Sequence, residues 1–361
     1  MKKVLMKGNE AIGEAAIRAG CLNYFAYPIT PQSEVAEYLS KRMPEVGGVF
    51  LQGESEVAVG YMIFGAAACG ARVFTTSSSP GISLMSEAIS YIAGAECPAV
   101  FVNIMRGGPG LGGILPSQGD YLQSTKGGGH GDYRMLVMAP ASVQEAAEMV
   151  MQAFPLAEKY RNPVMILGDG LIGQMMEPVM FPDHLRSEPS NKDAWATNGM
   201  DTRKSDKRNL VKSLYLDPNV LNSQNLKLKA KYEQMKREEI RFESYNTEVP
   251  YQALIVSYGT MSRVCKTAIE NLKEKGIEVG LIRPQTLFPF PEMAIRQACD
   301  RPECRVVLSI EMSMGQMLED VERSVQGKKP VEWYGKCGGE VPTPEEVMDV
   351  VRSFLKQYGK E

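Results

Sequence analysis

The chain has 361 residues, a length that predicts about two domains, each large enough to bury a core of its own. With 23% charged residues and a formal net charge of −3, it has neither the basic field that nucleic acid requires nor a cationic face for membranes. Its seven cysteines form no C-x-x-C pair and no apolar run reaches spanning length, so we expect a cytoplasmic protein without a zinc or iron–sulfur site of its own.

The first half of the chain alternates strand and helix patterns. Short apolar runs predict strands at 3–6, 22–26, 72–76, 98–104, 135–139 and 164–168. Helical spacing predicts helices at 8–19, 31–43, 82–95 and 142–160. This alternation indicates an α/β fold with a mostly parallel sheet covered by helices on both faces. In such a sheet ligands bind beyond the carboxyl ends of the strands, so the segments that follow the strands are the candidates for a site.

The first of these segments is a stiff turn, Tyr27-Pro28-Ile29-Thr30-Pro31, at the end of the strand at 22–26. Its two prolines fix φ at their own positions and bias the residues before them toward extended geometry. The hydroxyl of Thr30 is therefore held on a rigid support. From the residues alone, a threonine flanked by prolines is first of all a turn residue.

The segment from Gln52 to Gly81 carries the most information about function. Glu54 and Glu56 open it, and the small apolar residues that follow predict a slender helix that other backbones can approach closely. A short strand and a polar turn of serines close it, at the sheet edge where ligands bind. A carboxylate at the head of a buried helix, beside such a turn, is placed to handle protons. Acidic residues at a helix start also complement the helix dipole, and composition alone favours this simpler interpretation as a cap.

Beyond this segment, Arg106 leads into a glycine-rich loop at 107–132 that is too long for a simple connection and is therefore functional or mobile. From 177 to about 249 the chain is charged and broken by prolines at 178, 182 and 189, and the stretch 226–245 predicts an amphipathic helix. A second, smaller α/β unit begins near 253 and ends with a helix at 345–358. We therefore predict domains at 1–177 and 250–361, joined by a charged helical arm at 178–249.

Four motifs follow one another in the first domain: YPITP at 27–31, LQGESE at 51–56, TSSSPG at 76–81 and MRGGPG at 105–110. In this order they resemble the α subunit of the 2-oxoacid:ferredoxin oxidoreductases, with the branched-chain (2-oxoisovalerate) subgroup as the best match. The second unit, with IVSYGT at 255–260, LIRPQTLFP at 281–289 and SIEMSMGQ at 309–316, is similar to that family's transketolase C-terminal-like domain. The resemblance implies a doubly wound parallel sheet that binds the pyrimidine half of thiamine diphosphate, plus a smaller α/β domain.

The resemblance also assigns roles to residues of these motifs. Glu56 matches the family's catalytic glutamate, which bonds to N1′ of the cofactor's aminopyrimidine, whereas Glu54 lies one step too early and is left as a cap or surface acid. Thr30 and Arg106 match the contacts to the substrate carboxylate, for which a fixed hydroxyl and a guanidinium suit the chemistry. The implied cofactor-binding residues are Tyr27, Pro28, Ile29 and Glu56.

The reaction implied is the oxidative decarboxylation of a 2-oxoacid, with 2-oxoisovalerate as the first choice, to an acyl-coenzyme A with transfer of electrons to ferredoxin. The resemblance places the Mg²⁺–diphosphate half of the cofactor site on a beta subunit that also carries iron–sulfur clusters. A gamma subunit and, as an optional member, a small ferredoxin-like delta subunit complete the complex. The alternatives are a member specific for 2-oxoglutarate or pyruvate, a scaffolding subunit without a catalytic residue, and a self-contained enzyme of the transketolase type.

Two further features have a functional and a simpler interpretation. Gly168-Asp169-Gly170 with Asn198 superficially resembles the metal–diphosphate motif of thiamine enzymes, but prolines crowd the interval where a helix and a strand should lie. We therefore interpret Asp169 as the last turn of the first domain. His130, in the glycine-rich loop, is better explained as a polar loop residue than as a proton shuttle, although its position near the predicted cleft leaves the second interpretation open.

Overall fold

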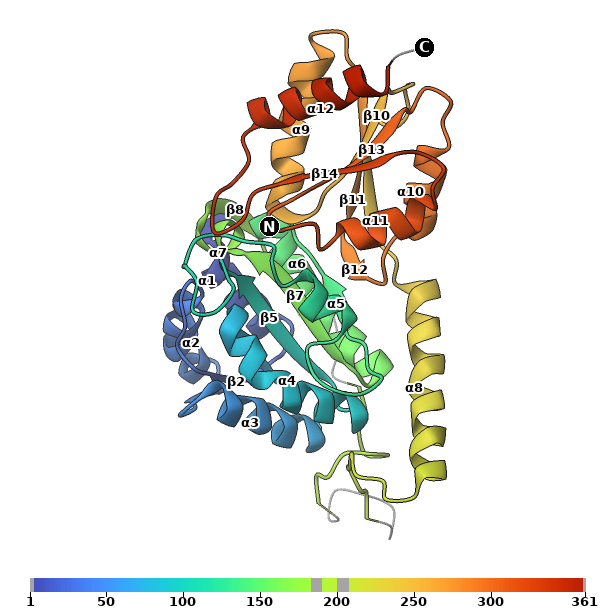
Figure 1. Ribbon diagram of the computed structural model, residues 1–361. Helices are drawn as coiled ribbons and strands as arrows, with labels where there is room; N and C mark the ends of the chain where they lie inside the picture. Colours follow the sequence, from blue (N-terminus) through green and yellow to red (C-terminus); the bar gives the residue numbers. More distant parts are fainter. Residues whose placement is uncertain (1–2, 183–189, 200–207, 360–361) are drawn as a thin grey trace.

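The computed structural model describes residues 3–182, 190–199 and 208–359, and it shows two stacked α/β units flanked by a long helix (Figure 1). Residues 3–182 build most of the lower unit in the figure and residues 242–359 most of the upper one; we call them the first and the second unit. Pro189, one of the prolines of the charged arm, lies outside the described residues.

The main sheet of the first unit has seven strands in the order β12-β6-β7-β5-β4-β2-β3. Their bounds are β2 (Asn23–Ala26), β3 (Val49–Gln52), β4 (Phe74–Ser77), β5 (Ala99–Met105), β6 (Leu136–Met138), β7 (Pro163–Asp169) and β12 (Thr286–Phe288). All neighbours run parallel except β12, which pairs antiparallel with β6. Every residue of β5 and β7 is buried, as expected for central strands covered on both faces. The predicted doubly wound sheet is confirmed.

The helices of the first unit pack on this sheet in groups. Helix α1 packs against α2 and α6, and α3 packs against α4. The helix bounds are α1 (Gly8–Arg18), α2 (Ser33–Glu45), α3 (Glu56–Ala68), α4 (Ser79–Gly94), α5 (Tyr121–Lys126), α6 (Val143–Tyr160) and α7 (Gly170–Gln174). A separate antiparallel pair, β1 (Lys3–Lys7) with β8 (Met176–Met180), closes the unit. Among the described residues, no helix combines the length and the apolar character needed to cross a membrane.

The second unit is the smaller α/β body that the sequence predicts. Its strand order is β14-β13-β10-β11-β9, with bounds β9 (Phe242–Tyr245), β10 (Ala253–Val256), β11 (Val279–Pro284), β13 (Val306–Glu311) and β14 (Val331–Gly335). Its helices pair as α9 with α12 and α10 with α11, with bounds α9 (Gly259–Lys273), α10 (Glu292–Cys299), α11 (Leu318–Val325) and α12 (Pro344–Gln357). The side of this sheet that α9 and α12 cover buries a core of its own, whereas Ile295 of α10 and Val321 of α11 belong to a hydrophobic cluster that continues into the first unit.

The charged arm differs from the prediction. Helix α8 (Pro218–Glu238) starts earlier than expected, where Asp217 accepts a hydrogen bond from Asn219 N at 2.9 Å, and the predicted helix at 226–245 is wrong beyond residue 238. Residues 242–245 instead form β9, which pairs antiparallel with β11. Its residues alternate between exposed and half-buried, which suits an edge strand. Strand β8 crosses residue 177, β9 lies before residue 250 yet pairs in the sheet of the second unit, and β12 lies after it yet pairs in the sheet of the first unit. The division at 177 and 249 stays a prediction.

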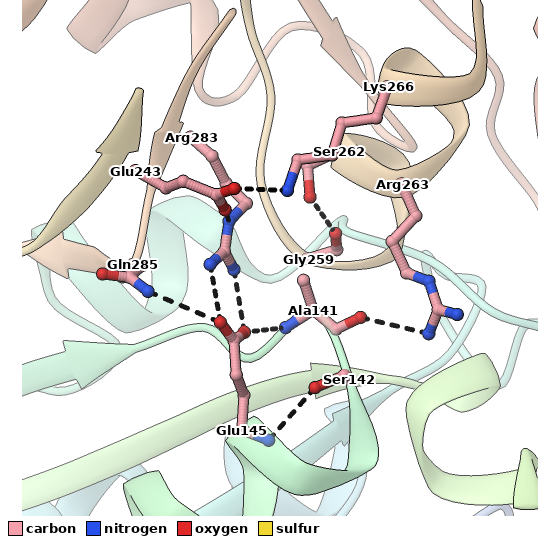
Figure 2. Close-up of polar contacts among 10 residues, drawn as sticks. All are labelled: Ala141, Ser142, Glu145, Glu243, Gly259, Ser262, Arg263, Lys266, Arg283 and Gln285. Atoms are coloured by element: carbon pink, nitrogen blue, oxygen red, sulfur yellow. Dashed lines mark hydrogen bonds and ion pairs between the residues drawn. The ribbon is translucent and has the colours of Figure 1, made fainter. Parts of the chain in front are cut away.

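Buried polar contacts tie the two units together, as Figure 2 shows. Arg283 of β11 donates to both carboxylate oxygens of Glu145 in α6, at 2.8 and 2.6 Å, and to Glu243 of β9 at 2.6 Å. At a second point the carboxylate of Asp169, at the end of β7, accepts from the hydroxyl of Thr260 at 2.9 Å. The ion pair of the buried Arg283 with Glu145, and the hydrogen bond between Asp169 and Thr260, therefore fix the orientation of the two units relative to each other.

The glycine-rich loop at 107–132 is not a free connection. It contains α5, and Gln118 just before this helix donates from Nε2 to Tyr258 O and accepts at Oε1 from Met312 N, both at 2.9 Å. Gln316 Nε2 donates to Gly119 O at 2.6 Å. The middle of the loop is thus hydrogen-bonded to the second unit. Whether the loop is functional or mobile stays a prediction.

Candidate active site

The turn at 27–31 lies at the carboxyl end of β2, as predicted, and side chains from α1 and α7 hold it by hydrogen bonds. Asn9 Nδ2 and Gln174 Nε2 both donate to the carbonyl of Pro31, at 2.8 and 2.9 Å. Pro28 and Thr30 are exposed and Tyr27 and Ile29 are half-buried, so the turn presents a surface to any ligand that approaches this edge. Its rigidity comes from the prolines and from these two amide donors.

Glu56 is the first residue of α3 and is 8% exposed, whereas Glu54 is exposed. The helix is capped by Ser55, whose Oγ accepts from Ala58 N at 3.2 Å, so the N-cap hydrogen bond does not need Glu56. Within residues 3–182, 190–199 and 208–359, no group donates a hydrogen bond to the Glu56 carboxylate. A buried carboxylate normally finds donors, and this one is left for a ligand.

Helix α4 approaches Glu56 closely because residue 81 is glycine. A Cβ there would stand 2.1 Å from Ser77 Oγ and 3.0 Å from both Cγ and Oε1 of Glu56. The hydroxyls of Ser77 and Ser78, at the end of β4, are buried and have no hydrogen-bond partner among the described residues. One carboxylate and two hydroxyls without partners therefore gather at one point of the sheet edge.

Arg106, at the end of β5, is 7% exposed and reaches the turn at 27–31. Its Nη1 donates to Thr30 O at 2.9 Å and its Nη2 to Leu111 O at 3.2 Å, while Nε is buried and has no partner among the described residues. Its backbone N–H donates to Ser79 Oγ at 3.1 Å, and Ser79 is two residues from Ser77. The structure thus brings Arg106 and Thr30 together, and the start of α4 links them to Glu56.

Asp120 is a residue of this region that the sequence did not single out. Its Oδ2 accepts from Ser79 Oγ at 2.6 Å and from Asn103 Nδ2 at 2.9 Å. Burial raises the pKa of the Asp120 carboxyl, although both donors act in the opposite direction. Its partners lie on β5 and α4, far apart in the chain, so no local pattern marks it. Gln32 was missed for the same reason, because its partner Thr76 is distant in the chain. Its side chain is fully buried, with Oε1 accepting from the Thr76 hydroxyl and Nε2 without a partner among the described residues.

A hollow of about 710 Å³ opens beside Arg106, between the two units; we call it the inter-unit hollow. The first unit contributes Ser79, Leu84 and the glycine-rich backbone at 107–110, and the second contributes Met312 and Met314. Asp120 is an acidic group in its wall, and none of its lining residues is a lysine, arginine or histidine. The hollow is therefore largely apolar and carries no positive charge of its own.

The remaining sequence candidates take no part in these contacts. Asp169 is 1% exposed, caps α7 through Leu171 N at 3.0 Å and bonds to Thr260, and burial raises the pKa of its carboxyl. Asn198 lies on the surface and donates to Asp193 at 3.3 Å, so the two do not form a common site. His130 is exposed, with its ring 5.9 Å from that of Tyr91. Among the described residues, no group of three or more His, Cys, Asp or Glu side chains is placed to hold a metal ion.

Comparisons with known proteins identify relatives of this chain. The family model for the thiamine diphosphate-binding domain of pyruvate flavodoxin/ferredoxin oxidoreductases matches residues 14–241, and that for core domain II of pyruvate:ferredoxin oxidoreductase matches residues 252–347. The chain is 47% identical to the ketoisovalerate oxidoreductase subunit VorB of Methanothermobacter thermautotrophicus, over 98% of either chain. It is 37% identical to the 2-oxoglutarate synthase subunit KorA of Archaeoglobus fulgidus, over 98% of this chain and 100% of the relative.

Two solved structures have a similar fold. One is the 2-oxoglutarate:ferredoxin oxidoreductase from Magnetococcus marinus with 2-oxoglutarate, coenzyme A and succinyl-CoA bound, with a TM-score of 0.87 at 26% identity over 97% of this chain; our chain spans 65% of that one. The other, a split-gene transketolase, has a TM-score of 0.59 at 14% identity over 98% of this chain and 99% of that one, which shows the fold alone. The chain belongs to the 2-oxoacid:ferredoxin oxidoreductase family as an α-type subunit, and its first unit carries that family's thiamine diphosphate-binding domain.

Proposed function

We propose that this chain supplies the pyrimidine half of a thiamine diphosphate site in a multi-subunit enzyme that oxidatively decarboxylates 2-oxoisovalerate. The observation that carries the proposal is the Glu56 carboxylate, which is 8% exposed and accepts no hydrogen bond from the described residues. A donor from a ligand, such as a protonated ring nitrogen, satisfies it. With the cofactor bound, Glu56 would hold or release a proton at a ring nitrogen of the aminopyrimidine and so set the basicity of that ring.

The residues around Glu56 fit a polar heterocycle. The buried hydroxyls of Ser77 and Ser78 lack partners, and hydrogen bonds from or to a ring with several nitrogens would satisfy them. Tyr27, Pro28 and Ile29, in the rigid turn across the sheet edge, offer the backbone and apolar surface that support such a ring. When bound, thiamine diphosphate supplies a carbon nucleophile for the 2-oxo carbon and accepts the electron pair that departing carbon dioxide leaves.

Arg106 and Thr30 are proposed to hold the carboxylate of the 2-oxoacid. Two of the three guanidinium nitrogens of Arg106 are engaged by carbonyls, which fix the plane of the group. Its Nε–H remains as a buried, charge-assisted donor, and Thr30, whose carbonyl accepts from Nη1, is an exposed residue with a hydroxyl. A carboxylate held in this way is oriented before it leaves as carbon dioxide.

Two observations favour 2-oxoisovalerate over 2-oxoglutarate. Identity to the ketoisovalerate oxidoreductase subunits is 46–47%, against 34–37% for the 2-oxoglutarate synthase subunits from archaea. The lining of the inter-unit hollow beside Arg106 includes Leu84, Met312 and Met314 together with serines, glutamines and Asp120, and none of its residues is a cation that could pair with a second carboxylate. A branched apolar side chain suits that lining, and a dicarboxylic acid does not.

The other half of the site is proposed to lie on a beta subunit. Asp169 lies in a segment that superficially resembles the metal–diphosphate motif, but its carboxylate already accepts hydrogen bonds from Thr260 and from the backbone of α7. The beta subunit would hold Mg²⁺, the diphosphate and the iron–sulfur clusters, with a gamma subunit and an optional ferredoxin-like delta subunit beside it. Coenzyme A is the acyl acceptor and ferredoxin the electron acceptor.

The test is the Glu56→Gln variant in the complete complex, with Glu54→Gln as the matched control. We expect oxidation of 2-oxoisovalerate to fall by about 10²–10⁴-fold in the first variant and to stay at the wild-type rate in the second. Undiminished activity of Glu56→Gln would show that this subunit is a scaffold. Faster turnover of 2-oxoglutarate or pyruvate than of 2-oxoisovalerate would overturn the assignment of the substrate. Micromolar binding of the cofactor with Mg²⁺ by the isolated chain would indicate a self-contained enzyme.

A further inference from the structure

Asp120 directly precedes α5, in the part of the glycine-rich loop that contacts the second unit. Its four nearest neighbours in the chain, residues 118, 119, 121 and 122, all form hydrogen bonds to that unit, with Met312, Gln316 and Asp320 as their partners. The side chain of Asp120 bonds instead to the first unit. This residue therefore connects a segment held by the second unit to the candidate active site.

A role as helix cap does not explain the Asp120 carboxylate. An aspartate in this position before a helix normally accepts a hydrogen bond from a backbone N–H in the first turn, but Asp120 makes no such bond. Its Oδ2 accepts from Ser79 Oγ at the start of α4, at 2.6 Å, and from Asn103 Nδ2 in β5, at 2.9 Å. Both partners belong to elements that border the candidate site.

The Ser79 hydroxyl links Asp120 to Arg106. This hydroxyl has one proton and two acceptors within reach, Asp120 Oδ2 at 2.6 Å and Arg106 O at 3.3 Å. The shorter bond is charge-assisted and is therefore the stronger, so the proton points to Asp120. A lone pair of Ser79 Oγ is then left for the backbone N–H of Arg106, which donates to it at 3.1 Å. The Asp120 carboxylate thus orients the hydroxyl that holds the backbone of Arg106.

We propose that Asp120 is a positioning residue for the carboxylate of the 2-oxoacid, and that it acts on Arg106 through Ser79. This inference rests on the proposed function, in which Arg106 holds that carboxylate. Nη1 and Nη2 of Arg106 donate to the carbonyls of Thr30 and Leu111, so the direction of the remaining Nε–H depends on where the Arg106 backbone lies. Because the neighbours of Asp120 are bonded to the second unit, a shift of that unit would also reach Arg106 along this route.

A direct effect of the Asp120 charge on the substrate is the competing explanation, since Asp120 also lines the inter-unit hollow. The two explanations require different properties of the side chain. Positioning through Ser79 requires an oxygen that accepts hydrogen bonds, which an amide also has. A direct electrostatic effect requires the negative charge, which an amide lacks. Asparagine at this position therefore separates the two.

The test is the steady-state KM for 2-oxoisovalerate in the complete complex. In Asp120→Ala the Ser79 proton is free to turn to Arg106 O, and we expect KM to rise at least about tenfold, the effect of one lost hydrogen bond to a charged group, with kcat little changed. Asp120→Asn keeps an acceptor, although a neutral one, and should raise KM by only about threefold. The control is Asp132→Ala, an exposed aspartate of the same loop, which should keep the wild-type KM.

A second variant, Ser79→Ala, tests the route itself. It removes the linking hydroxyl and leaves the bond between Asp120 and Asn103 in place, so it carries the test should Asp120→Ala fail to assemble. We expect the same rise in KM as in Asp120→Ala. The double variant should have a KM no higher than that of either single variant, because both substitutions interrupt one chain of hydrogen bonds.

The outcomes separate this inference from the proposed function. A wild-type KM in Ser79→Ala, or a KM in Asp120→Asn as high as that in Asp120→Ala, would overturn the route through Ser79. Loss of cofactor and a lowered melting temperature in Ser79→Ala, without a specific change in KM, would overturn it as well, since the contact would then be structural only. Arg106→Met tests the proposed function: a wild-type KM there would refute it, whereas a raised KM there with a wild-type KM in Ser79→Ala would refute this inference alone.

Discussion

Replacement of Arg283 by methionine tests how the two units are held together. The side chain of Arg283 is 3% exposed and makes three charge-assisted hydrogen bonds, two to Glu145 and one to Glu243, across the joint seen in Figure 2. Methionine fills similar space without the charge. The substitution therefore removes the ion pairs and leaves two carboxylates facing each other.

The loss in the free energy of unfolding depends on how much water can reach the two carboxylates once Arg283 is gone. Breaking a fully buried ion pair costs about 3–5 kcal/mol. Glu145 and Glu243 keep 25% and 31% of their side-chain surface exposed, so water replaces part of what Arg283 supplied. Lys266 still pairs with Glu243 at 2.5 Å, and Ala141 N still donates to Glu145 at 2.8 Å. We therefore expect a loss of about 2–3 kcal/mol in the free energy of unfolding.

Thermal unfolding provides the assay. For a unit of this size, about 2–4 °C is lost per kcal/mol, so the midpoint should fall by roughly 4–12 °C. The matched control is Arg263→Met, which removes an ion pair of an arginine that is 44% exposed and should cost about 1 kcal/mol or less. A midpoint for Arg283→Met no lower than that of the control would refute the reasoning.

The difference in stability between Arg283→Met and the wild type should also become smaller in acid. Burial alone would raise the pKa of the Glu145 carboxyl, but Arg283 outweighs it and holds that pKa below its ordinary value. A carboxyl with a lowered folded-state pKa contributes stability that is fully present above its unfolded pKa, about 4.3, and is lost as the pH falls through the folded value. The gap in stability between wild type and Arg283→Met should therefore narrow below about pH 4.

Three further predictions concern the loop, the site and α8. Gln118→Ala leaves two buried backbone groups of the second unit without a partner and should cost about 2–4 kcal/mol in chemical denaturation. Gln123→Ala, in the same loop, removes one hydrogen bond to the Ser83 hydroxyl and should cost under about 1 kcal/mol. Gly81→Ala forces a Cβ to 2.1 Å from Ser77 Oγ and should weaken cofactor binding by the complex at least tenfold in a calorimetric titration, about 1.4 kcal/mol. Burial pushes the pKa of Glu96 up, but two lysines of α8 bring it down to about 2, so the protection of the α8 amides, measured against the intrinsic exchange rate at each pH, should fall as the pH drops from about 4.5 toward 2 and, in Glu96→Gln, already at neutral pH.

Periodicity in the sequence was sufficient for the elements that the core determines. The strands at 99–105 and 163–169 are buried throughout, and the helix at 143–160 has a continuous apolar side, so their patterns are strong. Strand β3 was missed because it is an edge strand with mostly exposed residues, which leaves little alternation to detect. The helix expected at 226–245 was too long because pairing of β9 with β11 is a tertiary effect that local composition does not encode.

The candidate site was predictable where a motif stays within one segment. Glu56 with its capping Ser55, and the turn around Thr30, are local features, and the structure places Thr30 in contact with Arg106. Asp120 and Gln32 were not predictable, because their partners come from other strands and helices and because unpaired buried atoms show only in three dimensions. Whether these residues take the proposed roles stays a prediction.

The most direct measurement of the central claim is the exchange of the cofactor's C2 proton for deuterium in the assembled complex. If the Glu56 carboxylate drives formation of the basic imino group, exchange in Glu56→Gln should slow by about 10²-fold or more, while Glu54→Gln exchanges like wild type. Cofactor content, measured in the same samples, shows that binding is retained. An unchanged exchange rate in a Glu56→Gln complex loaded with cofactor would contradict the account.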